Sequence, residues 1–185
     1  MATSFAESSG TLLALSHNLA EIVEQTGRSI VAVNARRRRS SSAVYWRSGI
    51  LVTAEHAINR EDDLSVTLPD NQTARATLVG RDPGTDLAVL RLDANGQSLA
   101  SLTPATLGEA TELKVGNLVL AIARSQDSGV SASMGVISAL SGSWRSWHGG
   151  RIDQLIRPSL MLYPGFSGGA LVNTVGQIVG INTVG

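Results

Sequence analysis

Ser167 lies in a glycine-rich segment, PGFSGG at residues 164–169, just ahead of an apolar stretch. Because glycine adopts backbone angles that are closed to other residues, such a turn can aim several N–H groups and one side chain at the same point. Acyl transfer from a serine needs that arrangement: Oγ attacks a carbonyl while neighbouring N–H groups hold the developing oxyanion. The segment indicates a nucleophile, and the competing interpretation is a plain glycine turn.

The order of residues along the chain decides which base and acid could serve Ser167. The histidines are His17, His56 and His148, and no His, Asp or Glu follows Ser167. That excludes the α/β-hydrolase order, in which acid and histidine follow the serine. The subtilisin order could use only His148, because no Asp precedes His56, and it needs βαβ units that the pattern does not show. The order His, Asp, Ser remains.

The local patterns around His56 and Asp86 suit that order. His56 follows an apolar, β-branched run at 50–54 that predicts a buried strand, so its ring would be held rigidly at a strand end. Asp86 stands between a Pro-Gly turn and a second apolar run at 87–92. A carboxylate that opens a buried strand needs a partner. Asp82, inside the turn, is expected to be a turn former.

Together, these segments resemble the HtrA/DegP-like branch of the chymotrypsin-fold serine proteases. TAEHAI at 53–58 is similar to the histidine motif of that family, and TDLAVL at 85–90 to its aspartate motif. GFSGGALVN at 165–173 is similar to the serine motif. The resemblance covers roughly residues 19–185, with the motifs in register.

The resemblance implies a role for each matched position. Ser167 would be the nucleophile, His56 the general base and acid, and Asp86 the residue that orients His56. The backbone N–H groups of Gly165 and Ser167 would form the oxyanion hole. This agrees with the chemistry, since a serine hydroxyl needs an imidazole to take its proton, and the imidazole needs a carboxylate to fix its tautomer.

The resemblance also implies where the substrate would bind. Met161 matches the base of the primary specificity pocket, while Thr183 would run beside the substrate near Asp86 and Val184 would stand at the pocket wall. The family often trimerises through an N-terminal aromatic segment. The resemblance therefore implies a homo-oligomer such as a trimer, with Phe5 as a candidate for the contact.

The elements that position these residues are expected to be mainly strands. Short apolar runs bounded by turns predict strands at 29–34, 43–46, 50–53, 64–68, 75–79, 87–92, 117–123, 131–139, 154–156, 169–173 and 177–182. One helix is expected at 15–25, from apolar residues on one face and a terminating glycine. Many short strands without intervening helices favour an all-β fold of two antiparallel, six-stranded-type β-barrels.

The expected organisation is one protease domain in three parts. Residues 1–14 form a flexible N-terminal segment, residues 15–110 the helix and first barrel with His56 and Asp86, and residues 111–185 the second barrel with Ser167. The family normally continues into a further strand, so the second barrel is expected to be incomplete at the C-terminus.

Composition limits the possible partners. The chain has 185 residues with 15 basic and 15 acidic side chains, so no overall field attracts nucleic acid or an anionic membrane. It has no cysteine, and its histidines lack zinc-ligand spacing, so we expect no metal and no cofactor. The N-terminal residues show no signal-peptide pattern, which predicts a cytoplasmic location.

Two functions follow from these observations. The first is a serine endopeptidase that cleaves unfolded or exposed polypeptides through an acyl-enzyme. The second is a non-catalytic peptide-binding or chaperone-like protein on the same fold, with an idle triad.

Overall fold

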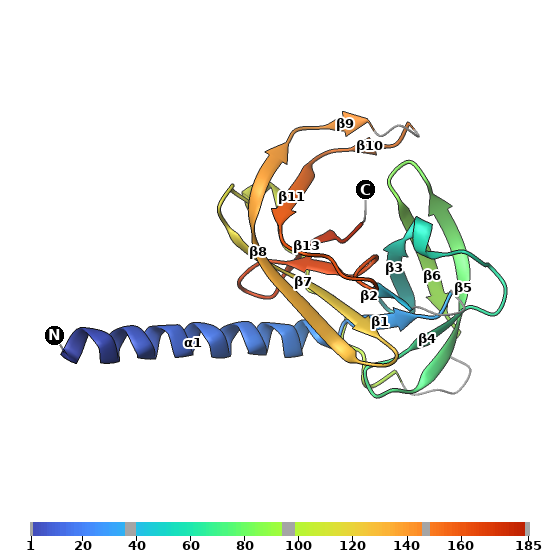
Figure 1. Ribbon diagram of the computed structural model, residues 1–185. Coiled ribbons are helices and arrows are strands. Elements are labelled where there is room, and N and C mark those ends of the chain that lie inside the picture. The colour runs from blue at the N-terminus through green and yellow to red at the C-terminus, as the bar shows by residue number, and fades with distance from the viewer. Residues whose placement is uncertain (1, 36–39, 94–98, 146–148, 184–185) are drawn as a thin grey trace.

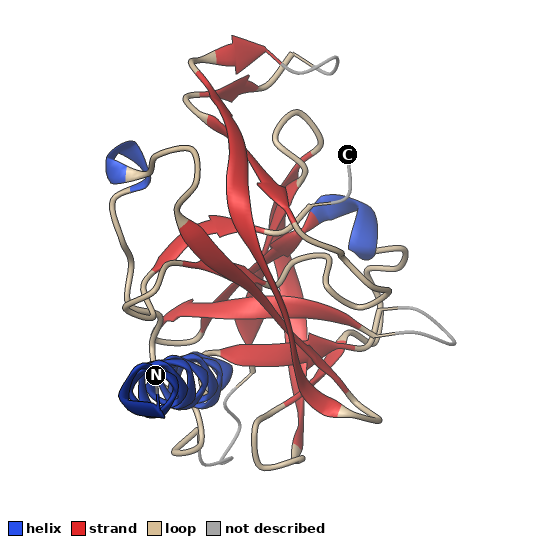
Figure 2. Ribbon diagram, turned by 60° about the vertical axis from the view of Figure 1, so that its left-hand side comes forward, coloured by secondary structure: helices blue, strands red, loops and turns tan. Residues whose placement is uncertain are grey.

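The computed structural model describes residues 2–35, 40–93, 99–145 and 149–183, and strands dominate it apart from one long helix (Figure 1, Figure 2). The N-terminal half forms a closed barrel. Its strands follow the order β1 (Ile30–Val33), β2 (Ser41–Arg47), β3 (Ile50–Ala54), β6 (Leu87–Leu92), β5 (Thr73–Asp82) and β4 (Ser65–Thr67), with β4 returning to β1.

Alternation along the strands fills the interior of this barrel. In β6, the side chains of Ala88, Leu90 and Leu92 are buried, while the residues between them are more exposed. They pack with buried residues such as Val33 and Leu51 from the strands around them. Because successive side chains of a strand point to opposite faces, the apolar alternation read from the sequence faces one core.

The C-terminal half forms a curled sheet of five strands. Its order is β11 (Leu155–Ser159), β8 (Gly129–Ser141), β7 (Leu118–Ser125), β12 (Ala170–Val172) and β13 (Ile178–Ile181), so β11 and β13 are the two edges. The sheet curves like an unclosed barrel (Figure 1). A separate small hairpin pairs β9 (Trp144–Arg145) with β10 (Arg151–Ile152).

The two halves meet along an apolar layer. On β1, Val31 and Val33 face the core of the first barrel, whereas Ile30 joins a different cluster. There it packs with Ile122 of β7 and Val172 of β12, which belong to the second sheet. The barrels are therefore held against each other by burial of apolar surface.

The helix α1 (Ala2–Gly27) reaches this layer only with its last turns. Leu19, Ile22 and Val23 pack against the layer, while Leu12 and Leu13 are exposed and the helix projects away from the barrels (Figure 1). Within the described part of the chain, no helix is both long and apolar enough to cross a bilayer.

The expected fold is confirmed, with local differences. Each of the predicted strand ranges overlaps an observed strand, and the first barrel is closed while the second is not. The helix ends at the expected glycine but begins at Ala2, and so includes residues expected to be a flexible segment. The β9–β10 hairpin was not predicted, because two-residue strands leave no periodic pattern.

Candidate active site

Strand register brings His56 and Asp86 to the same end of the first barrel. Strands β3 and β6 are antiparallel neighbours in which Ala54 pairs with Leu87. The residue after the end of β3 and the residue before the start of β6 are therefore adjacent, and Glu55 N–H donates to Asp86 O at 2.9 Å. The short 3₁₀ turn η1 (Glu55–Ala57) follows β3 at once and carries His56.

Asp86 holds both the backbone and the ring of His56. Its Oδ1 accepts the backbone N–H of His56 at 3.0 Å, and its Oδ2 lies 2.7 Å from Nδ1 of the ring. Because a carboxylate only accepts hydrogen bonds, Nδ1 carries the proton and Nε2 is left as an acceptor. Asp86 adopts this position with φ +56°, in the left-handed region that non-glycine residues seldom occupy.

Ser167 completes the cluster from the second half of the molecule. Its Oγ lies 3.0 Å from His56 Nε2, within hydrogen-bond distance. The side chains of His56 and Asp86 are 34% and 28% exposed, so the cluster is sheltered yet open to solvent on one side. The structure thus brings together the three predicted triad residues, from sequence positions far apart.

The turn that carries Ser167 fits between the two barrels. Gly168 has φ +80°, and a Cβ there would overlap Ser42 O and Thr53 Oγ1 of the first barrel. A Cβ at Gly169 would overlap Ile122 O on the other side. Both glycines are therefore required by close approach of backbones.

The expected oxyanion donors are Gly165 and Ser167. Gly165 has φ +103°, a conformation that suits glycine. Among the described residues, neither its N–H nor that of Ser167 has a hydrogen-bond partner, whereas Gly168 N–H donates to Asn182 O and Gly169 N–H to Phe166 O. Two half-buried donors beside the serine are therefore available to an acceptor.

The acidic residue next to His56 is paired with an arginine. Glu55, directly before His56, has a side chain that is only 20% exposed, and it accepts from Arg81 at 2.9 Å. The other guanidinium nitrogen of Arg81 lies 2.9 Å from Glu61. Arg81 therefore places a positive charge next to Glu55, close to His56 in sequence.

Two residues that sequence reasoning missed, Ser42 and Arg124, support the serine turn. Ser42 of β2 is fully buried, and its hydroxyl and N–H reach Gly165 O at 2.7 Å and Ser167 O at 2.9 Å. Arg124 of β7 is also buried, and burial lowers the pKa of its guanidinium. A charged residue inside an apolar strand was the available signal for Arg124, while a serine in a strand gives none.

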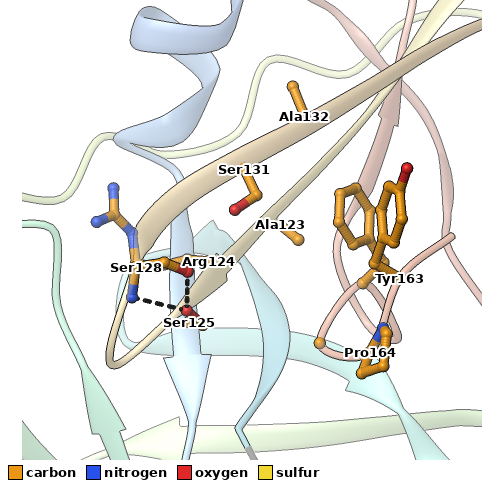
Figure 3. Close-up of a pocket in the computed structure, with 10 residues that line it drawn as sticks. Ala123, Arg124, Ser125, Ser128, Ser131, Ala132, Tyr163 and Pro164 are labelled. Atoms are coloured by element: carbon orange, nitrogen blue, oxygen red, sulfur yellow. Dashed lines mark hydrogen bonds between the residues drawn. The ribbon is translucent and has the colours of Figure 1, made fainter.

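A shallow cavity of about 360 Å³ is lined in part by residues of the serine turn (Figure 3). Tyr163 and Pro164 of the turn lie across it from Ser131 and Ala132 of β8. Phe166 closes its base with a side chain that is 3% exposed, packed against Ala121 and Ala123. Ser167 is not among the residues that line the cavity.

The other predicted residues differ in how far the structure describes them. Met161 is 63% exposed, and Thr183 is half-buried directly after Asn182. Val184 and His148 lie outside the described residues. His17 is exposed on α1, on a different element from the cluster. The side chain of Phe5 lies outside the described part of the structure.

Comparison with known proteins adds an independent line of observation. A family model of trypsin-like peptidase domains matches residues 41–181. The chain is 34% identical to a probable periplasmic serine endoprotease DegP-like of Halomonas elongata, over 80% of this chain and 30% of that protein. It is 32% identical to the periplasmic pH-dependent serine endoprotease DegQ of Escherichia coli K12, over 73% of this chain and 28% of that protein.

A solved structure of similar shape is that of Deg5. It superposes with a TM-score of 0.80 at 26% identity, and covers 91% of this chain and 85% of the Deg5 chain. The chain spans less than a third of the two curated relatives named above. The expectation of a cytoplasmic location is wrong, because these relatives are named as periplasmic proteins. A missing signal-peptide pattern was too weak an observation to decide the compartment.

Proposed function

The chain belongs to the trypsin-like peptidase domain family, of the HtrA-like kind, and from this premise we propose that it cleaves peptide bonds with Ser167 as nucleophile. In this proposal His56 is the general base and acid, and Asp86 orients it. The observation that carries the proposal is the position of the His56 ring, whose two nitrogens lie 2.7 Å from Asp86 and 3.0 Å from Ser167.

Acylation uses each of these groups in turn. His56 Nε2 takes the proton of the Ser167 hydroxyl as Oγ attacks the carbonyl carbon of the scissile bond. The carbonyl oxygen becomes an oxyanion, which accepts hydrogen bonds from the N–H groups of Gly165 and Ser167. Asp86 stabilises the imidazolium. The intermediate collapses when Nε2 gives its proton to the leaving amine, and an ester on Oγ remains.

Deacylation repeats the sequence with water. His56 Nε2 takes a proton from water as the hydroxide attacks the ester carbon, and the same two N–H groups hold the second oxyanion. The C–Oγ bond then breaks, and Nε2 returns the proton to Ser167. The products are a new carboxyl terminus, a new amino terminus and the free enzyme.

The proposed substrates are unfolded or exposed polypeptides. We propose that Met161 contributes to the pocket for the residue before the cleaved bond. A thioether side chain offers no negative charge to a basic residue, so cleavage after small or medium aliphatic residues such as Val, Ala or Ile is expected. Profiling with a peptide library measures this preference. A clear preference for Arg or Lys would contradict it.

The proposed mechanism is tested by covalent labelling. A fluorophosphonate should add once to the protein, at Ser167, as measured by intact and peptide mass spectrometry. Ser167→Ala should abolish the adduct and lower kcat by on the order of 10⁶-fold, since members of a triad act as a unit. Ser48→Ala is the matched control, because Ser48 is an exposed serine in the turn after β2.

Two outcomes would count against the proposal. Labelling of Ser167→Ala at the wild-type rate would remove Ser167 as nucleophile. Binding of unfolded polypeptide with neither labelling nor cleavage would favour the alternative, a non-catalytic peptide-binding or chaperone-like protein.

A further inference from the structure

Ser42 of β2 makes hydrogen bonds to two residues of the serine turn, although no sequence motif marks it. It is fully buried, and its N–H donates to Ser167 O at 2.9 Å. Its hydroxyl reaches Gly165 O at 2.7 Å, and its carbonyl accepts from Thr53 Oγ1 at 2.6 Å. One residue of the first barrel therefore contacts both residues whose N–H groups are proposed to hold the oxyanion.

The hydroxyl of Ser42 has a defined hydrogen-bond direction. Arg124 N–H donates to the Ser42 Oγ at 2.9 Å, which occupies one of its lone pairs. The single hydroxyl proton has two acceptors within reach, Gly165 O at 2.7 Å and Arg124 O at 3.2 Å. The shorter contact takes the proton, because hydroxyl donors favour distances near 2.7–2.8 Å.

This contact holds one peptide group of the turn at both ends. The Gly165 carbonyl belongs to the peptide unit whose N–H, that of Phe166, donates to Tyr163 O at 3.1 Å. Gly165 has φ +103° and no Cβ. The backbone angles of a glycine are weakly restricted, so they do not by themselves fix the orientation of its N–H. The Gly165 N–H belongs to the preceding peptide unit, which is joined to the held unit through the Gly165 Cα. Fixing one of the two units leaves the other fewer orientations, and we expect it to limit rotation of the Gly165 N–H away from the substrate.

From these contacts we propose that the buried hydroxyl of Ser42 is a positioning group that holds Gly165 in the orientation needed for oxyanion binding. Ser42 contacts no reacting atom, and it acts through the Gly165 carbonyl. The proposal rests on the proposed function, since this orientation matters for turnover only if Gly165 N–H serves an oxyanion.

The chain offers a matched control next to Ser42. Ser41 lies on the same strand and is also buried, but its Oγ has no hydrogen-bond partner among the described residues. Neighbouring strand residues point to opposite faces, so Ser41→Ala removes the same atoms without touching the turn. Ser42→Ala and Ser41→Ala are therefore compared in the full chain, with Ser42→Cys as a third variant that keeps a weak S–H donor.

In peptide hydrolysis, Ser42→Ala should lower kcat by about tenfold or more, short of the roughly 10²–10³-fold cost of removing an oxyanion donor outright. KM should stay within about twofold, because the interaction is made in the transition state. Affinity for a peptide boronate, which forms an anionic tetrahedral adduct, should fall with kcat, while affinity for the product peptide should not change. For Ser42→Cys, kcat and boronate affinity should lie between those of Ser42→Ala and the wild type. For Ser41→Ala, both should equal the wild-type values.

A second measurement does not depend on activity. Amide hydrogen exchange over residues 165–169 should become faster in Ser42→Ala and remain unchanged in Ser41→Ala, with the melting temperature as a check that both variants are folded. The proposal is overturned if kcat and exchange are the same in the two alanine variants, or if KM and product affinity change together with kcat.

Failure of the proposed function gives a different result. In that case the wild type neither labels with a fluorophosphonate nor cleaves peptide, and Ser42 is judged by exchange alone. Faster exchange only in Ser42→Ala would still support a positioning role for its hydroxyl, and equal exchange would reject it.

Discussion

At the scale of single residues, Asp86 has the most constrained position in the cluster. Its φ of +56° lies in the left-handed region, and its carboxylate accepts hydrogen bonds from both the backbone and the ring of His56. An unusual backbone angle at a residue with a chemical role is a recurring property of functional sites. The sequence placed Asp86 before a strand, but only the structure shows this double contact.

The residue-scale prediction concerns the charge of Asp86. Asn tolerates the left-handed region, so Asp86→Asn should leave the fold nearly unchanged. It should lower kcat by on the order of 10⁴-fold, because an amide stabilises the wrong imidazole tautomer and does not stabilise the imidazolium. Steady-state kinetics with a peptide substrate, together with thermal melting, measures both effects.

The control for that substitution lies at the other end of β6. The two carboxylate oxygens of Asp93 lie 3.3 and 3.2 Å from Thr77 Oγ1, in a solvent-exposed contact. Asp93→Asn should therefore keep wild-type turnover. Similar rates for the wild type and Asp86→Asn would contradict the role proposed for Asp86.

At the scale of elements, the serine turn is shaped by what lies on either side of it. Gly168 contacts backbone of β2 in the first barrel, and Gly169 contacts backbone of β7 in the second. Phe166 anchors the same turn in an apolar cluster beneath it. The turn is therefore rigid because neighbouring elements leave it little space, and its two glycines are the residues that fit.

The element-scale prediction is that Gly168→Ala destabilises the protein and lowers its activity. An alanine at φ +80° costs roughly 1–2 kcal/mol in conformation alone. Overlap of its Cβ with Ser42 O adds to that cost, because the overlapped atom belongs to the backbone. Urea unfolding should show the loss of stability, and kcat should fall because the turn must move.

Gly49 separates these two effects. It has φ +73°, but a Cβ there would meet nothing within 4 Å. Gly49→Ala should therefore show only the conformational cost and keep its activity. Equal loss of stability in Gly168→Ala and Gly49→Ala would mean that the close approach of backbones at Gly168 adds nothing to the cost of the substitution.

At the scale of the whole molecule, Arg124 of the second sheet makes hydrogen bonds to the helix and to the first barrel. Its Nε donates to Ile30 O of β1 at 2.7 Å, and one terminal nitrogen donates to Gly27 O, at the end of α1, at 2.9 Å. Its backbone meets Ser42 of β2. A cation at a helix C-terminus is also favoured by the helix dipole. The helix, the first barrel and the second sheet thus share one buried side chain.

The prediction at this scale is that Arg124→Lys destabilises the protein. An ammonium is a point donor on a flexible stem and does not reproduce the fork that reaches two carbonyls. Leaving one buried carbonyl without a partner costs about 1–3 kcal/mol. Urea unfolding measures the loss. Arg75→Lys on the exposed face of β5 is the control, and a comparable loss there would show that Arg124 has no special role.

Much of the architecture could be predicted because its signals are local. Strands such as β3 and β6 are apolar, β-branched or leucine-rich runs bounded by turns, and their burial follows from alternation. The helix end at Gly27 also followed from its residue type, whereas its start did not. Residues 2–14 mix Ser, Thr and Gly with Ala and Leu, so propensity alone did not favour a helix there.

The sequence by itself determined the order His56, Asp86, Ser167 and the all-β fold, because chain order and residue periodicity are properties of the chain alone. The tertiary structure decided which atoms meet: the register of β3 against β6, the unclosed second sheet, and the contacts of Ser42 and Arg124 across the barrels. Those contacts join residues 94 and 123 positions apart. Ser41 and Ser42 are adjacent in the same strand, so their local sequence is almost the same. Among the described residues the Ser41 hydroxyl has no hydrogen-bond partner, whereas the Ser42 hydroxyl donates to the Gly165 carbonyl. The difference arises only when the second barrel packs against the first.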